Sequence, residues 1–287
     1  MAIMTVGSEA GVTIRSYAPG DLSRVLALIA GDRLPGRPVV TASMLTHAVT
    51  GPGAGPGDPG AGVPAVPGTV LAVSAGGEVL GAAAWAVRRD DGDGLLLWSH
   101  CVDDDQEIAG LLVRHVLERL GRRTVRAFAC ATAPGFAGLP VRSRRGTAVA
   151  LETAGFSRQE GWTYLHHRLD PHSPRPYGLG DVIECADPRY GWYVRLWERD
   201  GSLVGKATVT RPVEGASVLE WIALMPRRGG FGHGVLERCL APLVGHGVRE
   251  VVTLLDTAEP GDSAVRDLHD RAGFREIDQL HPYTRRP

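Results

Sequence analysis

The hydrophobic and polar positions between residues 218 and 243 predict a strand, a glycine-rich turn and a helix, in that order. Residues 218–224 are rich in β-branched, aromatic and large apolar side chains, which is typical of a strand. Apolar residues then recur at the spacing of one helix face, at Val235, Leu236, Cys239, Leu240 and Leu243. A glycine-rich turn that opens a helix presents backbone N–H groups at the positive end of the helix dipole. Arg227 and Arg228 add charge, so the turn predicts a site for a diphosphate.

The spacing of this turn separates it from two common phosphate-binding motifs. No Gly-Lys-Ser/Thr follows it, and it lacks the wider G-x-G-x-x-G spacing of dinucleotide-binding folds. The pattern Arg227-x-x-Gly230-x-Gly232 resembles the R/Q-x-x-G-x-G/A signature of the GNAT superfamily of CoA-dependent N-acyltransferases. Residues 263–274, which end in Ala-Gly-Phe, resemble the family's A-x-x-L-Y-x-x-x-G-F helix and turn. The alternative is a flexible basic loop that caps an ordinary helix.

The same pattern occurs twice along the chain. The spacing from Trp98 to Ala109 is 11 positions, as it is from Trp221 to Gly232. Each copy continues with a helix, a strand, an Ala-Gly-Phe and a short aromatic or His-containing strand, the last near residues 162–165 and 279–284. Two fused domains explain this long period better than a solenoid does.

The first copy differs from the second at the phosphate turn. Asp104, Glu107 and Ala109 stand where the second copy has Arg227, Gly230 and Gly232. Carboxylates repel a diphosphate but stabilise a helix N-terminus. We therefore expect the first copy to bind no CoA.

The resemblance implies an α/β (α+β) protein of two tandem GNAT-like domains, each a mixed twisted sheet flanked by helices. We expect a degenerate, non-catalytic scaffold domain at 1–170, a linker at 171–180 and a domain with the acyl-CoA site at 181–287. The implied reaction is direct transfer of an acetyl group from acetyl-CoA, as co-substrate, to a primary amine of a small molecule. The residues implied in CoA binding are Leu224 and Met225 beside the pantetheine arm, Arg227 as a positive charge, and the main chain of Arg228, Gly229, Gly230, Phe231, Gly232, His233 and Gly234.

Acyl transfer to an amine needs a base for the ammonium proton and an acid for the leaving thiolate. In GNAT enzymes the base is often a carboxylate on the strand before the phosphate turn, and Glu220 lies there, where the first copy has Leu97. The alternative is an ordinary surface or edge-strand carboxylate. The family's usual acid is a tyrosine four residues before the Gly of Gly-Phe. Here that residue is His269, which titrates near neutrality; the alternative is a polar residue on the exposed face of the last helix.

The composition narrows the class of protein further. With 287 residues the chain is long enough for two domains, and its net charge of −1 argues against a dedicated nucleic-acid binder. The four cysteines are scattered, without metal-ligand spacing, as expected for thiols in a reducing compartment. No apolar run approaches about 18 residues. We expect a cytoplasmic, bacterial protein without a metal or a membrane segment, acting as a monomer or homodimer.

Two other functions are compatible with these residues. One is a GNAT-derived protein that binds acyl-CoA, or serves as a scaffold, without turnover. The missing tyrosine favours it. The other is an acyltransferase with a different donor, such as an aminoacyl-tRNA or a carrier-protein thioester, which would need a basic surface track.

Overall fold

The computed structural model describes residues 11–50, 67–170, 180–187, 191–197, 201–224, 235–256 and 262–287. By their contacts the residues form two units. Unit 1 comprises Met1–Arg33, Val40–Gly161 and Gln279–Pro287, and unit 2 comprises Leu34–Val39 and Trp162–Asp278. None of the described helices is long and apolar enough to cross a membrane.

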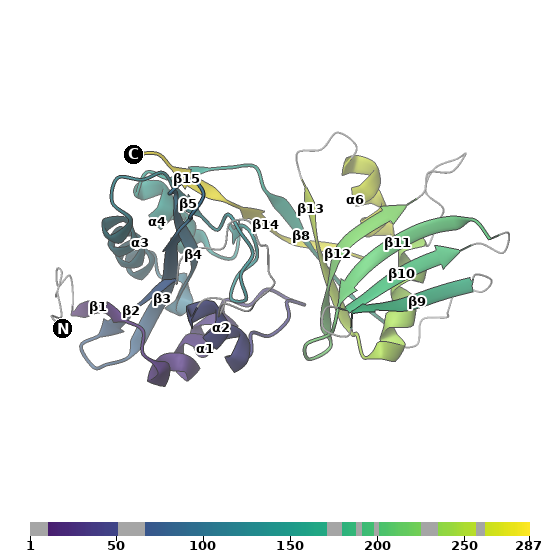
Figure 1. Cartoon of the computed structure of the whole chain (residues 1–287), viewed down its shortest axis with the longest axis horizontal. Coiled ribbons are helices and arrows are strands. Elements are labelled where there is room, and N and C mark those ends of the chain that lie inside the picture. The colour runs from purple at the N-terminus through teal and green to yellow at the C-terminus, as the bar shows by residue number, and fades with distance from the viewer. Residues whose placement is uncertain are drawn as a thin grey trace. The chain divides into compact units, whose positions relative to one another are not determined.

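Unit 1 is built on a seven-stranded mixed sheet with the order β1-β2-β3-β4-β5-β15-β7 (Figure 1). Its strands are β1 (Val12–Ser16), β2 (Gly68–Ser74), β3 (Val79–Val87), β4 (Gly94–Cys101), β5 (Val125–Ala127), β7 (Ser157–Arg158) and β15 (Tyr283–Arg285). Its helices are α1 (Leu22–Gly31), α2 (Ala42–Thr50), α3 (Gln106–Leu120) and α4 (Arg145–Thr153), with 3-10 turns at Pro19–Asp21 and Val102–Asp104.

Helices cover both faces of this sheet because successive strand residues point to opposite sides. On one face α3 and α4 pack against Ala83 and Leu96, and on the other α1 and α2 pack against Ala84 and Leu97. Strand β4 is buried along its whole length, as expected for a strand between two helix layers.

Within its described residues, unit 2 repeats this order of elements without the two opening helices. Its strands are β8 (Trp162–Arg168), β9 (Gly180–Asp187), β10 (Gly191–Trp197), β11 (Leu203–Thr210), β12 (Ala216–Leu224), β13 (Glu250–Asp256) and β14 (Arg275–His281). They follow the order β14-β8-β13-β12-β11-β10-β9, and one further strand of two residues, β6 (Leu139–Pro140), pairs with the end of β14 at Leu280 and His281. The helices are α5 (Val235–Leu240) and α6 (Asp262–Arg271).

The predicted strand and helix on either side of the phosphate turn are both present. Strand β12 ends at Leu224, and α5 begins at Val235 with Leu236, Cys239 and Leu240 buried in the core of unit 2. After Leu240 the chain continues as a 3-10 helix, Ala241–His246, because Pro242 has no N–H to donate into the α-helical ladder. Leu243 still reaches the core.

The last strand of each copy pairs within the sheet of the other copy. Strand β8 follows the Ala-Gly-Phe of the first copy, yet it pairs antiparallel with β13 in unit 2 over seven residues, from Trp162 to Arg168. Strand β15 follows the second copy and pairs with β5 and β7 in unit 1. The units therefore differ from the expected ranges 1–170 and 181–287, since β8 lies in the sheet of unit 2 and β15 in the sheet of unit 1.

Candidate functional site

A β-bulge interrupts β12 at Glu220. Trp221 lies opposite Thr208 of β11, whereas Leu219 lies opposite the next residue, Val209, so Glu220 is an extra residue without a partner in the register. Strand β4 of unit 1 has the same irregularity against β3, and there the extra residue is Leu97. A bulge bends the strand and changes the direction of one side chain, which is why bulges are common beside active sites.

The parallel pairing beside each bulge stops at the residue just before it. Strand β12 is in register with β13 from Ala216 to Leu219, and β4 is in register with β5 from Gly94 to Leu96. Beyond Leu219 the described part of β12 keeps its pairing with β11 alone. Main-chain groups on the β13 side of β12 can therefore pair with an extended ligand, as an added strand would.

Glu220 presents an exposed carboxylate at this divergence, whereas its counterpart Leu97 is buried, at 5% exposure. A carboxylate in contact with water can accept a proton from an incoming ammonium group, and leucine cannot. The two copies thus share the backbone geometry and differ in chemistry at this one position.

The predicted diphosphate cradle lies outside the described residues. Leu224 is the last residue of β12, and its main chain pairs with Gly205. Met225, Arg227 and Arg228 belong to the segment that is not described, together with Gly229, Gly230, Phe231, Gly232, His233 and Gly234. The structure places the strand before this segment and the helix after it as the sequence predicts.

His269 lies on α6 with its ring fully buried, which contradicts the alternative of an exposed polar residue. Its Nδ1 is 2.8 Å from the carbonyl oxygen of Val265, and the ring packs edge-on against Phe274. A carbonyl only accepts, so Nδ1 carries the proton and the neutral ring leaves Nε2 as an acceptor. Nε2 has no hydrogen-bond partner among the described atoms.

Burial lowers the pKa of His269, and it outweighs the opposing effect of the Val265 carbonyl. The imidazole is therefore neutral at pH 7. To donate a proton from Nε2, His269 must first take up a second proton, and this becomes favourable only in acid. Leu151 occupies the corresponding position in unit 1 and is also fully buried.

The corresponding turn of unit 1 is filled by its own carboxylates. Asp105 caps α3 by accepting hydrogen bonds from the backbone N–H groups of Glu107 (2.8 Å) and Ile108 (3.0 Å). Asp104 accepts from the backbone N–H groups of Gly146 and Thr147, at 2.5 and 3.1 Å, and so caps α4. The N–H groups that could hold an anion are already used at both helices.

The buried Arg144 balances the negative charge of these carboxylates, and the sequence analysis did not identify it. Its guanidinium is buried, 2.9 Å from carboxylate oxygens of both Asp104 and Asp32. Asp32 also pairs with His100 at 2.8 Å. No local pattern pairs Arg144 with Asp104, because 40 residues separate them.

No protein-family model matches the sequence, and no curated protein matches it significantly. Solved structures with a similar fold include a GCN5-related N-acetyltransferase from Sphaerobacter thermophilus, 17% identical, with a TM-score of 0.59 over 97% of each chain. A tandem GNAT protein from the clavulanic acid biosynthesis pathway is 16% identical, with a TM-score of 0.61 over 95% of this chain and 98% of that chain.

A glucosamine N-acetyltransferase region of a fungal multi-domain GH3 beta-N-acetylglucosaminidase is 13% identical, with a TM-score of 0.59 over 96% of this chain and 38% of that chain. At these identities the likeness establishes the fold. The expected architecture of two tandem GNAT-like units, each a mixed sheet flanked by helices, is confirmed. Within the described residues no group of His, Cys, Asp and Glu side chains is arranged to hold a metal ion.

Proposed function

We propose that this tandem GNAT-fold protein is an N-acetyltransferase, in which unit 2 moves an acetyl group from acetyl-CoA to a primary amine of a small molecule. The observation that carries the proposal is the bulge of β12, which presents the exposed Glu220 where β12 parts from β13. The solved structures with this fold are named as acetyltransferases, which supports the reaction class.

The acetyl-CoA donor would bind along the unpaired side of β12 and at the turn that follows it. Leu224 and Met225 are proposed to pair with the amides of the pantetheine arm. The diphosphate is assigned to the main chain from Arg228 to Gly234, with Arg227 as the counter-charge. The open side of β12 beyond Leu219 fits a strand-like ligand, whereas the turn of unit 1 is closed by Asp104 and Asp105.

Direct transfer needs the acceptor as a free amine, because an ammonium group has no lone pair. Glu220 is proposed to take that proton, directly or through a water molecule. The amine nitrogen then forms a bond to the thioester carbon, the carbon–sulfur bond breaks, and the CoA thiolate leaves with the electron pair. The thiolate finally takes up a proton.

His269 is proposed as the acid in this last step, under a condition set by its surroundings. The neutral ring has its proton on Nδ1, so donation from Nε2 requires the imidazolium form. Burial lowers the pKa of His269, so this form is populated only in acid. An acid role for His269 therefore predicts a rate that falls as the pH rises toward neutrality.

A second candidate function is acyl-CoA binding without turnover. The buried, neutral His269 in place of the family's usual tyrosine favours it. Both functions predict that acetyl-CoA binds to unit 2, and only the first predicts that an amine releases CoA thiol.

Thermal unfolding with acetyl-CoA tests the binding step. At a ligand concentration of about 100 times Kd, we expect a stabilisation of about 2.7 kcal/mol, which Arg227→Glu abolishes. Arg122→Glu is the matched control, since Arg122 is exposed and belongs to unit 1. Equal loss in both variants would refute the assignment of the site to unit 2. Thiol release over a panel of small amines then distinguishes an enzyme from a binding protein.

A further inference from the structure

Unit 1 contains a cavity of about 630 Å³ at the bulge of β4. One wall is α2, with Met44 and Ala48, and the floor is β4, with Leu97 and Trp98. The third side is the loop of residues 128–138, through Cys130 and Ala131. The volume lies within the range of about 300–1,000 Å³ that is typical of small-molecule sites.

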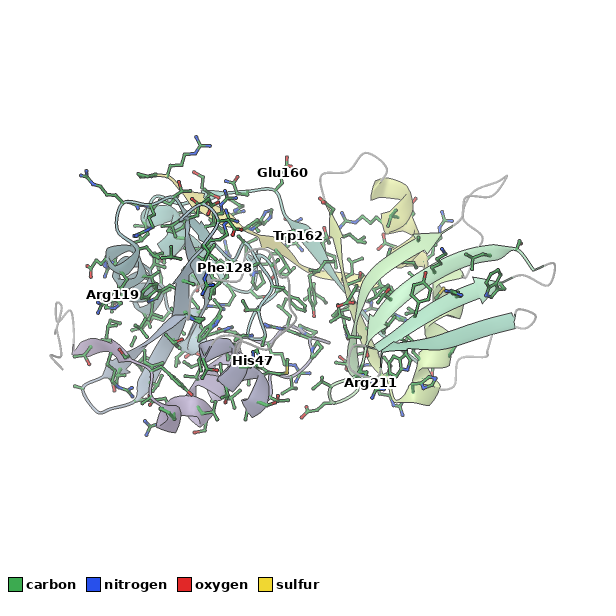
Figure 2. The ribbon with its side chains drawn as sticks, in the orientation of Figure 1. His47, Arg119, Phe128, Glu160, Trp162 and Arg211 are labelled. Atoms are coloured by element: carbon green, nitrogen blue, oxygen red, sulfur yellow. The ribbon has the colours of Figure 1, made fainter. Side chains whose placement is uncertain are left out.

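The chemistry of the lining selects against charged ligands. Among the described residues that line the cavity none is Asp, Glu, Lys or Arg, and most are Ala, Leu, Met, Pro or Trp. Leu97 stands at the bulge position where unit 2 has Glu220. His47, labelled on α2 in Figure 2, is exposed at this site. An ionic ligand would lose its hydration here without a counter-charge from β4.

Trp98 adds a specific polar feature to this apolar floor. The residue is 1% exposed, and its indole Nε1 has no hydrogen-bond partner among the described atoms. A buried N–H that makes no hydrogen bond is unfavourable, and few occur in native structures. An acceptor on a ligand in the cavity that this residue lines would satisfy it once the side chains that shield Nε1 from solvent shift.

The loop wall is held in place by its own hydrogen bonds. The Phe128 N–H donates to the Leu96 carbonyl at 2.9 Å, and Thr132 and Gly135 exchange backbone hydrogen bonds at 2.7 and 3.1 Å. Figure 2 labels Phe128 at the start of this loop. Cys130 is therefore an exposed residue on a defined wall, where burial raises the pKa of its thiol, whereas Cys101 and Cys239 are buried.

We propose that this cavity binds a compact, neutral and predominantly apolar molecule that carries one hydrogen-bond acceptor. Met44, Ala48 and Leu97 contact its body, and the indole N–H of Trp98 donates to its acceptor. Unit 1 is thereby a binding domain for a second small molecule, separate from the acetyl-CoA site proposed in unit 2.

The test uses 6-propionyl-2-dimethylaminonaphthalene, a neutral fluorophore with an apolar ring system and one ketone oxygen. We expect saturable, blue-shifted emission at one site per chain. Occupancy should slow the alkylation of Cys130 by iodoacetamide several-fold, as measured by mass spectrometry of the peptide that contains Cys130. Trp98→Phe keeps an aromatic ring and should weaken binding about fivefold, the effect of one lost hydrogen bond.

Two substitutions on the loop form a matched pair. Ala131 lines the cavity and Ala129 does not, although both are exposed, so Ala131→Trp should abolish fluorophore binding and Ala129→Trp should leave it unchanged. Emission that never saturates, or alkylation of Cys130 that is insensitive to the fluorophore, would overturn the proposal. So would equal behaviour of the two loop variants, or full affinity in Trp98→Phe.

The proposal can fail or hold independently of the acetyltransferase assignment. Arg227→Glu removes acetyl-CoA binding in the proposed function and should leave fluorophore binding at the wild-type level. Loss of fluorophore binding in Arg227→Glu would place the fluorophore in unit 2 and refute a site in unit 1.

Discussion

The carboxylate of Asp104 accepts a 2.6 Å hydrogen bond from the hydroxyl of Thr147, 43 residues further along the chain. The same carboxylate pairs with the buried Arg144. The side chain that replaces the first arginine of the phosphate turn is thus mostly buried, at 14% exposure, and tied to the interior of unit 1 through Arg144. Its acidic character serves the fold, because it caps α4 and balances a buried guanidinium.

Asp104→Ala should therefore destabilise unit 1 by about 3–5 kcal/mol, since it removes one partner of a buried ion pair. Urea unfolding measures the change. Asp103→Asn is the control: Asp103 is exposed and has a φ of 52°, a conformation that asparagine tolerates. We expect this control to stay within about 0.5 kcal/mol of wild type. Comparable stabilities of the two variants would show that Asp104 does not contribute this much to the free energy of unfolding.

Glu220→Gln should reduce kcat/KM by about 10²–10⁴-fold, the usual contribution of a general base. The exposed position of Glu220 predicts little change in stability, and acetyl-CoA should stabilise the variant as it stabilises wild type. Steady-state thiol release and thermal unfolding measure the two effects. Full activity in Glu220→Gln would show that Glu220 is not the base and that water alone takes the proton from the acceptor ammonium group.

His269 makes stability depend on pH. Burial lowers the pKa of His269 in the folded state below the ordinary value of about 6.5. The unfolded chain then binds more protons between the two pKa values, so stability is complete above about pH 6.5, falls as the pH drops from there to the lowered pKa, and levels off below it. Burial also lowers the pKa of His167, which stacks on Phe274 and adds to the same trend.

His269→Leu copies the residue that unit 1 has at this position, Leu151, and should remove part of that dependence. We expect the variant to gain stability relative to wild type at pH 5 and to show a smaller gain at pH 8. Chemical denaturation at several pH values measures the slope. An unchanged slope would mean that the imidazole titrates equally in the folded and unfolded chain.

Tyr283 lies late in the chain but stabilises unit 1. It is fully buried in the core that contains α3 and α4, and its strand β15 lies between β5 and β7. Tyr283→Ala should cost about 3–5 kcal/mol, as for other large aromatic residues in cores.

Hydrogen exchange would locate this effect. Amides of α3 should lose protection in Tyr283→Ala, and those of β13 in unit 2 should keep it. Arg286→Ala, at an exposed position three residues later, should change neither. If only the amides of β13 lost protection, the assignment of β15 to the sheet of unit 1 would be wrong.

The sequence predicted local features well because they depend on neighbouring residues. The strand that contains Glu220 and the helix that begins at Val235 follow from apolar spacing and are present. The match between Leu97 and Glu220 followed from the internal repeat, and the two bulges agree with it. The assignments to residues 225–234 remain predictions.

Long-range pairing could not be predicted in this way. The pattern of residues 162–168 is that of a half-buried strand in whichever sheet it enters, so periodicity does not identify its partner β13. Likewise, Arg144 gives no local sign that it neutralises Asp32 and Asp104. The burial of His269 was not predicted because a polar residue is usually expected on the exposed face of a helix, whereas His269 lies on the buried face of α6.

The exchanged strands impose an order on biosynthesis. The sheet of unit 1 lacks the strand between β5 and β7 until β15 has been made, about 120 residues after β8, which at about 5–20 residues per second takes on the order of ten seconds. During that interval the nascent first half has an open sheet edge beside a nearly complete core. Unit 1 therefore cannot complete its sheet until the residues of unit 2 have been synthesised, and an open edge of that kind is a template for pairing with another chain.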